Sequence, residues 1–414
     1  MKTSPRSDVP FLFATRVVRL FAYGALSVVL VLHLSAAGLD EARIGLLLTL
    51  TLLGDTALSL VVTTRADRVG RRRMLALGAA LMVLAGAVFA STSAFWILLL
   101  AATVGVMSPS GNEVGPFLAI EQAVVAQQVP PERRTATFAW YSLAGSLATA
   151  TGALAAGFAA EGLGRAGVSE LGSTRAVVLG YAALGLALAA LFAALSPAAE
   201  APPADRDAPP AAAPVLGLHR SRGVVLRLSG LFAVDAFAGG FVVQSFLAWW
   251  FHQRFGASPA LLGSIFFGAN VLAGFSALAA ASLARRIGLV NTMVATHLPS
   301  NVLLALVPLM PTLGLAVAVL LVRFSISQMD VPTRQSYTMA VVEPGERSAA
   351  AGVTGIARTV GAALAPAAAG PLYAVPALSG LPFLVAGGLK IVYDLLLWRS
   401  FRALRPPEER RPPA

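Results

Sequence analysis

The sequence predicts an all-α membrane protein with twelve spanning helices in two six-helix halves, and three observations lead to this fold class. The 414 residues are 57% hydrophobic and 12% charged, about half the charged fraction of a soluble domain. Apolar runs of about 20 residues, the length that crosses a bilayer, recur twelve times. A Pro/Ala-rich stretch, SPAAEAPPADRDAPPAAAP, separates the first six runs from the last six.

The first run extends from residue 11 to about residue 34, which is too long for the apolar core of a signal peptide, so we expect it to be a retained span. The Pro/Ala-rich stretch cannot form a packed core. We therefore predict an N-terminal half over residues 1–195, a linker over 196–222, and a C-terminal half with a short basic tail over 223–414. The predicted spans are 11–35, 42–64, 73–92, 95–127, 135–160, 174–195, 224–252, 259–283, 289–308, 312–342, 348–374 and 378–398.

Arginine placement predicts the orientation of these spans. Loops that follow even-numbered spans carry many arginines, as at residues 71–73 and 133–134, whereas loops that follow odd-numbered spans carry few. Because positively charged loops stay in the cytoplasm, both termini and the linker are predicted to be cytoplasmic, in the inner or plasma membrane. The same rule accounts for the net charge of +11 without a nucleic-acid partner.

Two pairs of loop sequences recur in the two halves. TTRADRVGRRRML after span 2 is similar to ASLARRIGLVNTM after span 8, and VPPERRTATFAW after span 4 is similar to VEPGERSAAAGV after span 10. The offset is 214 to 218 residues in both cases. This pattern indicates a duplication, which is typical of transporters built from two related halves.

The loop ADRVGRRR, residues 66–73, resembles the signature of the major facilitator superfamily, although Thr63 replaces its leading glycine. The resemblance implies that this loop latches the two halves in the outward-facing state. Glycine also permits the tight turn needed between two antiparallel helices. With SPSGNEVGPFLAIEQ and MDVPTRQSYTMAVVEPGERSAAAG, the chain further resembles a poorly characterised bacterial and fungal branch of the superfamily. The matching residues of the loop are Asp67, Arg68, Gly70, Arg71 and Arg72.

Span 5 contains GSLATATGALAAG, with glycines at 145, 152 and 157. This stretch resembles a glycine-rich motif of facilitators that export drugs in exchange for protons, but it lacks the usual Gly-Pro pair. Small residues also allow helices to pack closely in membranes, so both interpretations stay open.

Spans 4 and 10 are predicted to be interrupted helices. Pro109, Gly111, Gly115 and Pro116 break span 4, and QMDVPTRQ breaks span 10 at the equivalent position. Freed backbone groups must face protein or water rather than lipid, and matching interruptions in two halves indicate a transport site. We therefore expect the acids of span 4 to line a central aqueous cavity.

Ionisable side chains inside a bilayer are costly and are functional candidates. Glu113 and Glu121 are eight residues apart, about 80° on a continuous helix, so they need not form one site. A buried ion pair of Glu113 with Arg19 or Arg334 is the alternative to proton coupling. Asp55 could pair with Arg19 or cap a kink. The proton-coupling or cavity candidates are Glu113, Glu121, Asp55, Asp235 and Asp330, and the substrate-cavity candidates are Arg19, Tyr23, Asn112, Gln244, Arg334 and Gln335.

Three further expectations concern single side chains. Asp330 and Arg334 are spaced i, i+4 and can pair on one helix. Lys390 and Asp394 have the same spacing near a helix end and are expected to be structural. Trp249 and Trp250 are expected to anchor the outer end of span 7 at the membrane interface.

The sequence favours a secondary transporter over an enzyme. It contains no cysteine and no Walker motif, and its four histidines are scattered, so no metal, cofactor or catalytic residue is predicted. We expect a monomer that moves a small molecule by alternating access, as proton-coupled efflux. The alternatives are proton-coupled or facilitated uptake of a polar or anionic metabolite, and a receptor or sensor with a transport fold.

Overall fold

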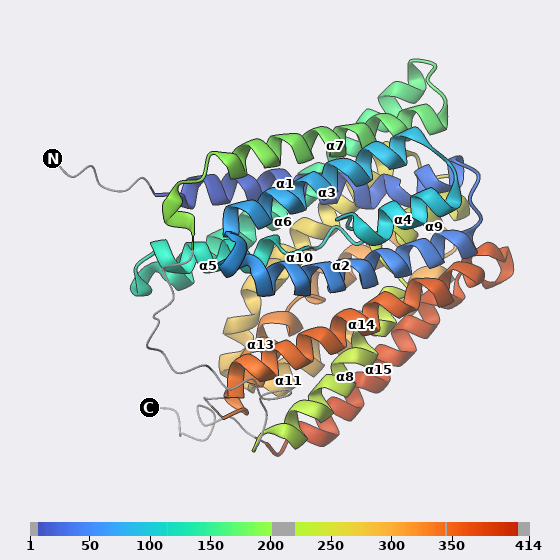
Figure 1. The fold of residues 1–414 in the computed structure, drawn as a ribbon. Coiled ribbons are helices and arrows are strands. Elements are labelled where there is room, and N and C mark those ends of the chain that lie inside the picture. Colours follow the sequence, from blue (N-terminus) through green and yellow to red (C-terminus); the bar gives the residue numbers. More distant parts are fainter. Residues whose placement is uncertain (1–6, 114, 201–219, 344–345, 405–414) are drawn as a thin grey trace. The chain divides into compact units, whose positions relative to one another are not determined.

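The computed structural model describes residues 7–113, 115–200, 220–343 and 346–404, and these form helices joined by short turns (Figure 1). Contacts divide the chain into two compact units. Unit 1 consists of Met1–Pro209 with Gln244–Phe267, and unit 2 consists of Pro210–Val243 with Gly268–Ala414. Residues 201–219, most of the predicted linker, lie outside the described part.

Unit 1 contains the first seven helices, a short 3-10 helix, one helix from the second half, and the start of another. They are α1 (Val9–Ala36), α2 (Glu41–Val69), α3 (Arg71–Ser91), α4 (Phe95–Val104), α5 (Phe117–Gln128), α6 (Pro131–Arg165), α7 (Glu170–Ala193), η1 (Pro197–Ala199), α9 (Gln244–Phe255) and the first turns of α10 (Pro259–Ile287).

Unit 2 contains α8 and everything that follows the first turns of α10. Its elements are α8 (Arg222–Gly240), α11 (Leu289–Leu306), η2 (Val307–Leu309), α12 (Leu313–Ile326), α13 (Asp330–Ala340), α14 (Arg347–Ala374), η4 (Pro376–Leu378) and α15 (Leu381–Phe401).

The predicted all-helical membrane fold is confirmed. Within the described residues, ten helical segments are long and apolar enough to cross a membrane. The other two predicted spans are α14, which has two internal prolines and Arg358, and span 4, of which only the short α4 is apolar. Spans 4, 7 and 10 each consist of two helices: α4 with α5, α8 with α9, and α12 with α13.

Helix α1 is the interior helix of unit 1. Its residues from Ala22 to Leu34 are buried without a break, as expected for a helix that is apolar all round, and it packs against α6, α7 and α9. The predicted interface position of Trp249 and Trp250 is wrong, because α9 is packed on α1 and both rings are buried. Tertiary packing of a broken span has overridden the usual interfacial preference of tryptophan.

Unit 2 is centred on α8, which lies against α14 and α15. Leu228 and Phe232 of α8 share a buried cluster with Tyr337, Tyr393 and Leu397. This apolar packing joins α8, α13 and α15. The same three helices carry the buried polar residues Asp235, Arg334 and Lys390.

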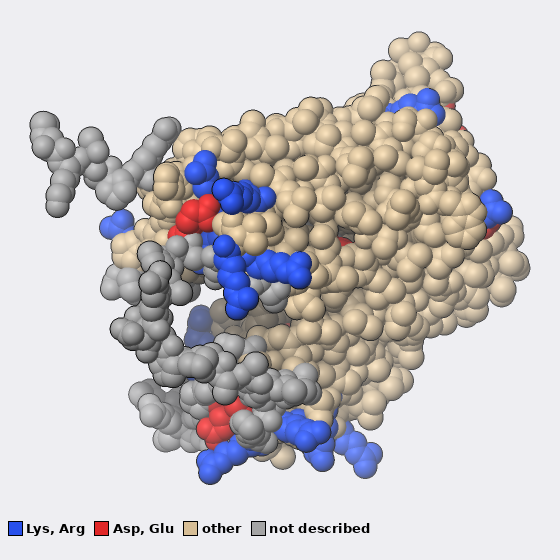
Figure 2. Space-filling model, viewed as in Figure 1, with Lys and Arg blue, Asp and Glu red and all other residues tan. Residues whose placement is uncertain are grey.

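Exposed charges in unit 1 gather at a helix end. In Figure 2 the visible flank of unit 1 is almost free of charge, and Lys and Arg side chains cluster where α2 passes into α3. At this end of unit 1, Asp8 joins the start of α1 to the end of α5 and to the segment that follows α7. Its carboxylate accepts hydrogen bonds from the Ser196 N–H (2.9 Å), the Ser196 hydroxyl (2.7 Å) and the Gln128 amide (2.8 Å).

Close approach of α1 and α6 depends on glycine. A Cβ at Gly152 would lie 2.0 Å from the carbonyl oxygen of Phe21, and one at Gly24 would lie 2.0 Å from that of Thr149. Neither backbone can move away, because α1 is enclosed on several sides. The two helices therefore touch through their main chains.

We predict that Gly152→Ala destabilises the protein by at least about 1–3 kcal/mol, the usual cost of overpacking, and lowers the thermal unfolding midpoint in detergent. Gly162→Ala is the matched control on the same helix, because nothing lies within 4 Å of its added methyl. Equal midpoints for the two variants would contradict the close contact of α1 with α6.

We also predict that Asp8→Asn destabilises the basic end of unit 1 in a pH-dependent way. Burial raises the pKa of Asp8, but hydrogen bonds from Ser196 and Gln128 and the charge of Arg72 lower it further, so its pKa lies below the ordinary value. A carboxylate whose pKa is depressed in the folded protein contributes stability above its unfolded pKa of about 3.9. That stability is lost as the pH falls through the folded pKa.

The Asp8→Asn variant should therefore be less stable than wild type at pH 7 by about 1–3 kcal/mol. The difference should shrink as the pH is lowered below about 4. Unfolding midpoints across pH 3 to 8 test this, and a difference that is constant with pH would contradict it.

Candidate functional site

Span 4 is interrupted between α4 and α5, where residues 105–113 and 115–116 have no regular helix. Gly111 has a φ of 71°, in the left-handed region that favours glycine. The Ser108 hydroxyl donates to the carbonyl of Asn112 at 2.8 Å and satisfies one freed backbone group. The interruption brings Glu113 close to α1 through a stretch of chain that no helix could follow.

Arg19 of α1 binds both acids of span 4. Its Nε donates to Glu113 at 2.7 Å, and its two terminal nitrogens donate to Glu121 at 2.8 and 2.7 Å. Arg16, one turn earlier, donates to the other oxygen of Glu113 at 2.8 Å. We call Arg16, Arg19, Glu113 and Glu121 the Arg19 cluster; its two cations and two carboxylates balance.

The two acids differ in access to water. Glu121 is fully buried and accepts from Thr15 and Tyr141 as well as from Arg19. The Glu113 side chain is 15% exposed. A fully paired, fully buried carboxylate holds helices together, whereas a partly exposed one can exchange a proton with water.

The helix break explains why both acids reach one arginine. On a continuous helix they would point about 80° apart, but the irregular segment redirects Glu113 while α5 carries Glu121. Of the two partners considered for Glu113, Arg19 is the one it binds; Arg334 belongs to unit 2.

The other predicted residues of unit 1 lie on α1, α2 and α9 and in the break of span 4. Tyr23 is buried one turn after Arg19. Gln244 of α9 donates to Ser27 of α1 at 2.7 Å. Asn112 lies beside Glu113 in the break, and it is exposed.

Asp55 does not pair with Arg19; of the two roles considered for it, a contact at the break of span 4 is the one found. It is buried on α2, and its carboxyl meets the backbone N–H of Gly115. Among the described residues it forms no ion pair. The break in span 4 supplies a backbone donor that the sequence did not reveal.

Unit 2 contains a second buried network around Asp235 of α8. Oδ1 of Asp235 accepts from Lys390 of α15 at 2.5 Å and lies 3.6 Å from His297 of α11. Oδ2 lies 3.4 Å from Arg334 of α13 and 3.3 Å from Arg358 of α14. We call these residues, with Asp330, the Asp235 cluster.

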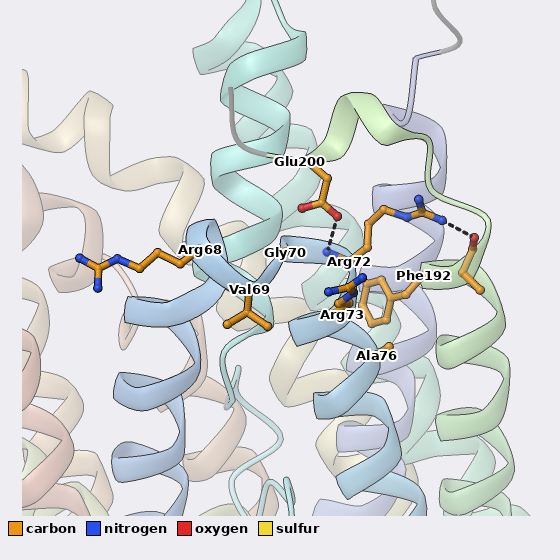
Figure 3. A pocket seen from close by; sticks show the side chains of 9 residues that line it. Arg68, Val69, Gly70, Arg72, Arg73, Ala76, Phe192 and Glu200 are labelled. Atoms are coloured by element: carbon orange, nitrogen blue, oxygen red, sulfur yellow. Dashed lines mark hydrogen bonds between the residues drawn. The ribbon is translucent and has the colours of Figure 1, made fainter. Parts of the chain in front are cut away.

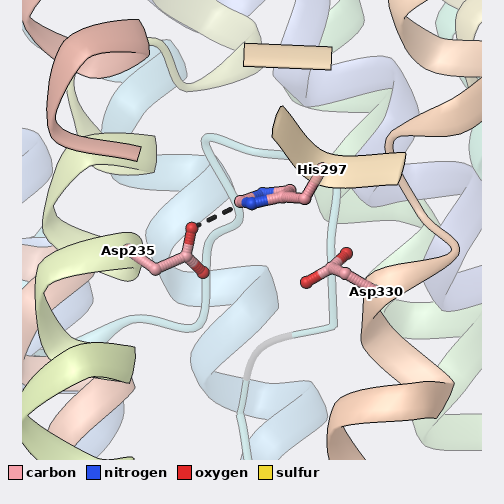
Figure 4. A group of neighbouring side chains, drawn as sticks. All are labelled: Asp235, His297 and Asp330. Carbon is pink, nitrogen blue, oxygen red and sulfur yellow. Dashed lines mark ion pairs between the residues drawn. The ribbon is translucent and has the colours of Figure 1, made fainter. Parts of the chain in front are cut away.

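Asp330 and Arg334 form the predicted i, i+4 pair, at 2.7 Å. Asp235, His297 and Asp330 also bring three ligand atoms within 4.8 Å of one another (Figure 4). This spacing would suit a metal ion. However, Lys390 pairs with Asp235 and Arg334 pairs with Asp330, so these two side chains already supply positive charge to the two carboxylates.

Lys390 and Asp394 do not pair with each other. Lys390 binds Asp235, while Asp394 accepts from Asn301 at 2.9 Å and lies 2.8 Å from Nδ1 of His297. Sequence reasoning did not select Lys390 or Arg358 as site residues, although a lysine in a membrane span is itself a functional signal. Gln335, which it did select, is exposed on α13.

The signature loop lies at the turn between α2 and α3 and lines a pocket closed on one side by Glu200 (Figure 3). Gly70 has a φ of 115°. The Glu200 carboxylate accepts from the backbone N–H groups of Arg71 (2.6 Å) and Arg72 (3.4 Å), the favourable place for an acid at a helix N-terminus.

The side chains of the signature arginines have different partners. Arg71 donates to Gln127 at 2.9 Å, and Arg72 donates to the Ala193 carbonyl at 3.0 Å. Arg68 is exposed and is one of the residues that line the pocket; its side chain extends away from Arg72 and Arg73 (Figure 3). The side chain of Asp67 lies outside those that the structure describes, so the latch between halves stays a prediction.

We predict that Arg19→Met lowers stability more than Arg19→Met combined with Glu121→Leu. The single change strands a buried carboxylate, at a cost of about 3–5 kcal/mol, whereas an apolar pair can replace a buried ion pair at little cost. A double-mutant cycle of unfolding midpoints measures the coupling. Additive effects would show that the two residues do not depend on each other.

Comparisons with known proteins agree with this architecture. A family model described as Major Facilitator Superfamily matches residues 12–366. The chain is 31% identical to the uncharacterized membrane protein YJR124C of Saccharomyces cerevisiae, over 94% of this chain and 93% of that protein.

Solved structures share the fold at low identity. The nucleoside transporter NupG superposes with a TM-score of 0.75 at 14% identity, covering 96% of this chain and all of that one. A bacterial homologue of the lysosomal transporter Spinster gives 0.74 at 15% identity over 98% of both chains. A D-xylose–proton symporter gives 0.71 at 15% identity, covering 94% of this chain and 97% of that one. The chain therefore belongs to the major facilitator superfamily.

Proposed function

We propose that this chain is a proton-coupled secondary transporter that moves a small molecule by alternating access, in the direction of efflux. Membership of the superfamily supports transport as the general function. A proton symporter and a nucleoside transporter are among the proteins that share the fold. Both termini are expected to be cytoplasmic, as the loop arginines predict.

The observation that carries the proposal is the position of Glu113. It lies in the break of span 4, is 15% exposed, and binds a different arginine with each carboxylate oxygen. Protonation would remove its charge and weaken its bonds to Arg16 and Arg19. Arg19 would remain paired with Glu121, so the fold would persist. The ion pairs that hold α1 to the break of span 4 would become weaker.

A contact that depends on a proton is what coupling requires. A ligand shifts a conformational equilibrium only through its different affinity for the two states. A proton on Glu113 favours whichever state separates the carboxyl from Arg16. Glu121 is less suited to this role, because four donors bind it and water does not reach it.

The glycines of α6 support efflux. Gly152 packs on the backbone of α1, and Gly157 packs on the backbone of α10, where its added Cβ would lie 2.3 Å from the carbonyl of Pro259. These contacts join three helices by their main chains, at positions that resemble the glycine-rich motif of proton-coupled exporters. Uptake of an anionic metabolite is the second candidate, favoured by the excess of cations in the Asp235 cluster.

We predict that Glu113→Gln slows substrate-dependent proton movement at least tenfold, because glutamine cannot exchange a proton at this position. Purified protein in liposomes loaded with a pH-sensitive dye, with gradients of both signs, measures rate and direction. The compounds added are ethidium, succinate and inorganic phosphate. Glu170→Gln is the control, since Glu170 is exposed at the start of α7.

Proton movement at the wild-type rate in Glu113→Gln would contradict the proposal and make Glu113 a structural partner of the two arginines. Binding of a compound by wild type without any flux would instead support a receptor or sensor. Flux that is independent of pH in wild type would indicate facilitated transport.

A further inference from the structure

The Asp235 cluster contains more positive than negative charge, and this excess has a chemical consequence if the chain transports a small molecule as proposed. Three side chains of the cluster are cations, Lys390, Arg334 and Arg358. A fourth cation, Arg323, lies within electrostatic range of its acids. Arginine does not lose its proton in proteins. Among the described residues, the carboxylates that form ion pairs with them are those of Asp235 and Asp330.

Two of the cations are neutralised by short ion pairs. Lys390 lies 2.5 Å from Asp235, and Arg334 lies 2.7 Å from Asp330. The third acid nearby, Asp394, is held by His297 and Asn301. Arg358 and Arg323 are therefore left without a carboxylate of their own.

Within the described part of the chain, the one ion pair of Arg358 is long and shared. Arg358 lies 3.3 Å from an Asp235 oxygen that Arg334 also approaches at 3.4 Å, whereas charge-assisted bonds are about 2.7–2.9 Å long. The two guanidiniums also repel each other. The Arg358 side chain is 34% exposed, so a solute can reach its remaining donors.

Arg323 of α12 has a buried Nε with no hydrogen-bond partner among the described residues. It forms no ion pair in that part of the chain, yet it lies within electrostatic range of Asp235 and Asp330. Its one described ring contact is with Phe324, the adjacent residue. A cation inside a membrane span that has a buried donor and no carboxylate is costly unless another anion binds it.

The Arg19 cluster of unit 1, unlike the Asp235 cluster, has equal numbers of positive and negative side chains. There two guanidiniums meet two carboxylates at 2.7–2.8 Å, and nothing further is needed for charge balance. The same type of buried network in unit 2 has two guanidiniums left over. The positive-inside rule concerns arginines in loops, so it does not explain Arg323 and Arg358, which lie within α12 and α14.

We propose that unit 2 binds an oxyanion, the carboxylate or phosphate group of the transported substrate, through Arg358 and Arg323. Guanidinium groups present a planar fork that matches either group. Asp235 with Lys390 and Asp330 with Arg334 form neutral pairs that hold the surrounding helices. The substrate anion supplies the charge that the protein lacks.

Binding to the full-length protein in detergent tests this assignment at constant ionic strength. The probes are succinate and inorganic phosphate, with choline as the cation and glucose as the neutral solute. We expect succinate, phosphate or both to raise the unfolding midpoint, and choline and glucose to leave it unchanged. The two oxyanions separate a carboxylate from a phosphate substrate.

Arg358→Gln and Arg323→Gln should each weaken oxyanion binding at least tenfold. Arg358→Lys should be intermediate, because it keeps the charge and loses the fork. Arg399→Gln, an exposed arginine at the end of α15, is the control and should bind as wild type does. Without ligand, both glutamine variants should be at least as stable as wild type, because they remove unbalanced charge.

Three results would overturn the assignment. The first is stabilisation by choline and by neither oxyanion. The second is oxyanion affinity in both glutamine variants that equals that of wild type. The third is a lower unfolding midpoint of the ligand-free glutamine variants, which would make the arginines structural.

Failure here is distinguishable from failure of proton coupling. If ethidium drives proton movement that Arg358→Gln leaves unchanged, the oxyanion site is wrong while coupling stands. If succinate or phosphate binds and Glu113→Gln retains full proton movement, the oxyanion site stands while the role of Glu113 is wrong.

Discussion

The interaction on which unit 1 depends is the fully buried guanidinium of Arg19. A cation in the middle of an interior helix must be neutralised, because water cannot reach it. Two carboxylates of span 4 do this at 2.7–2.8 Å. Both can reach it only if span 4 stops being a helix between them, so the charge on α1 and the break between α4 and α5 require each other.

The break has costs that the surrounding residues offset. A chain segment without helix leaves backbone groups unpaired, which is tolerated in a membrane only against protein or water. Ser108 binds the carbonyl of Asn112, and the N–H of Gly115 meets Asp55. Polar residues that look unrelated in the sequence are thus parts of one arrangement, in which α2 and α1 both support the irregular segment.

The two halves use the same device with different charge. Each contains a broken span, α4 with α5 or α12 with α13, and each break carries acids that meet arginines. In unit 1 the charges balance within the cluster. In unit 2 the acids are paired by Lys390 and Arg334, and two further arginines remain. Under the function proposed, unit 1 would exchange a proton and unit 2 would hold an anion.

Several features followed from the sequence alone. Hydrophobic runs of bilayer length predicted the spans, because a helix in lipid must be apolar over about 20 residues. Pro109, Gly111 and Pro116 predicted the interruption of span 4, and the i, i+4 spacing predicted the pair of Asp330 with Arg334. These are local properties, set by backbone geometry and by residues within one helical turn of each other.

The partners of buried charges were decided by tertiary structure. The spacing of Glu113 and Glu121 left open whether they share a site, and the break brings both onto Arg19. Lys390 and Asp394 looked like a pair within one helix, yet each bonds to a residue of a different helix. Trp249 and Trp250 looked like interface anchors until packing on α1 buried them. The physical reason is that a buried charge pairs with whatever opposite charge the helix packing brings within hydrogen-bond distance. Sequence spacing carries no information on that distance when the two charges lie on different helices.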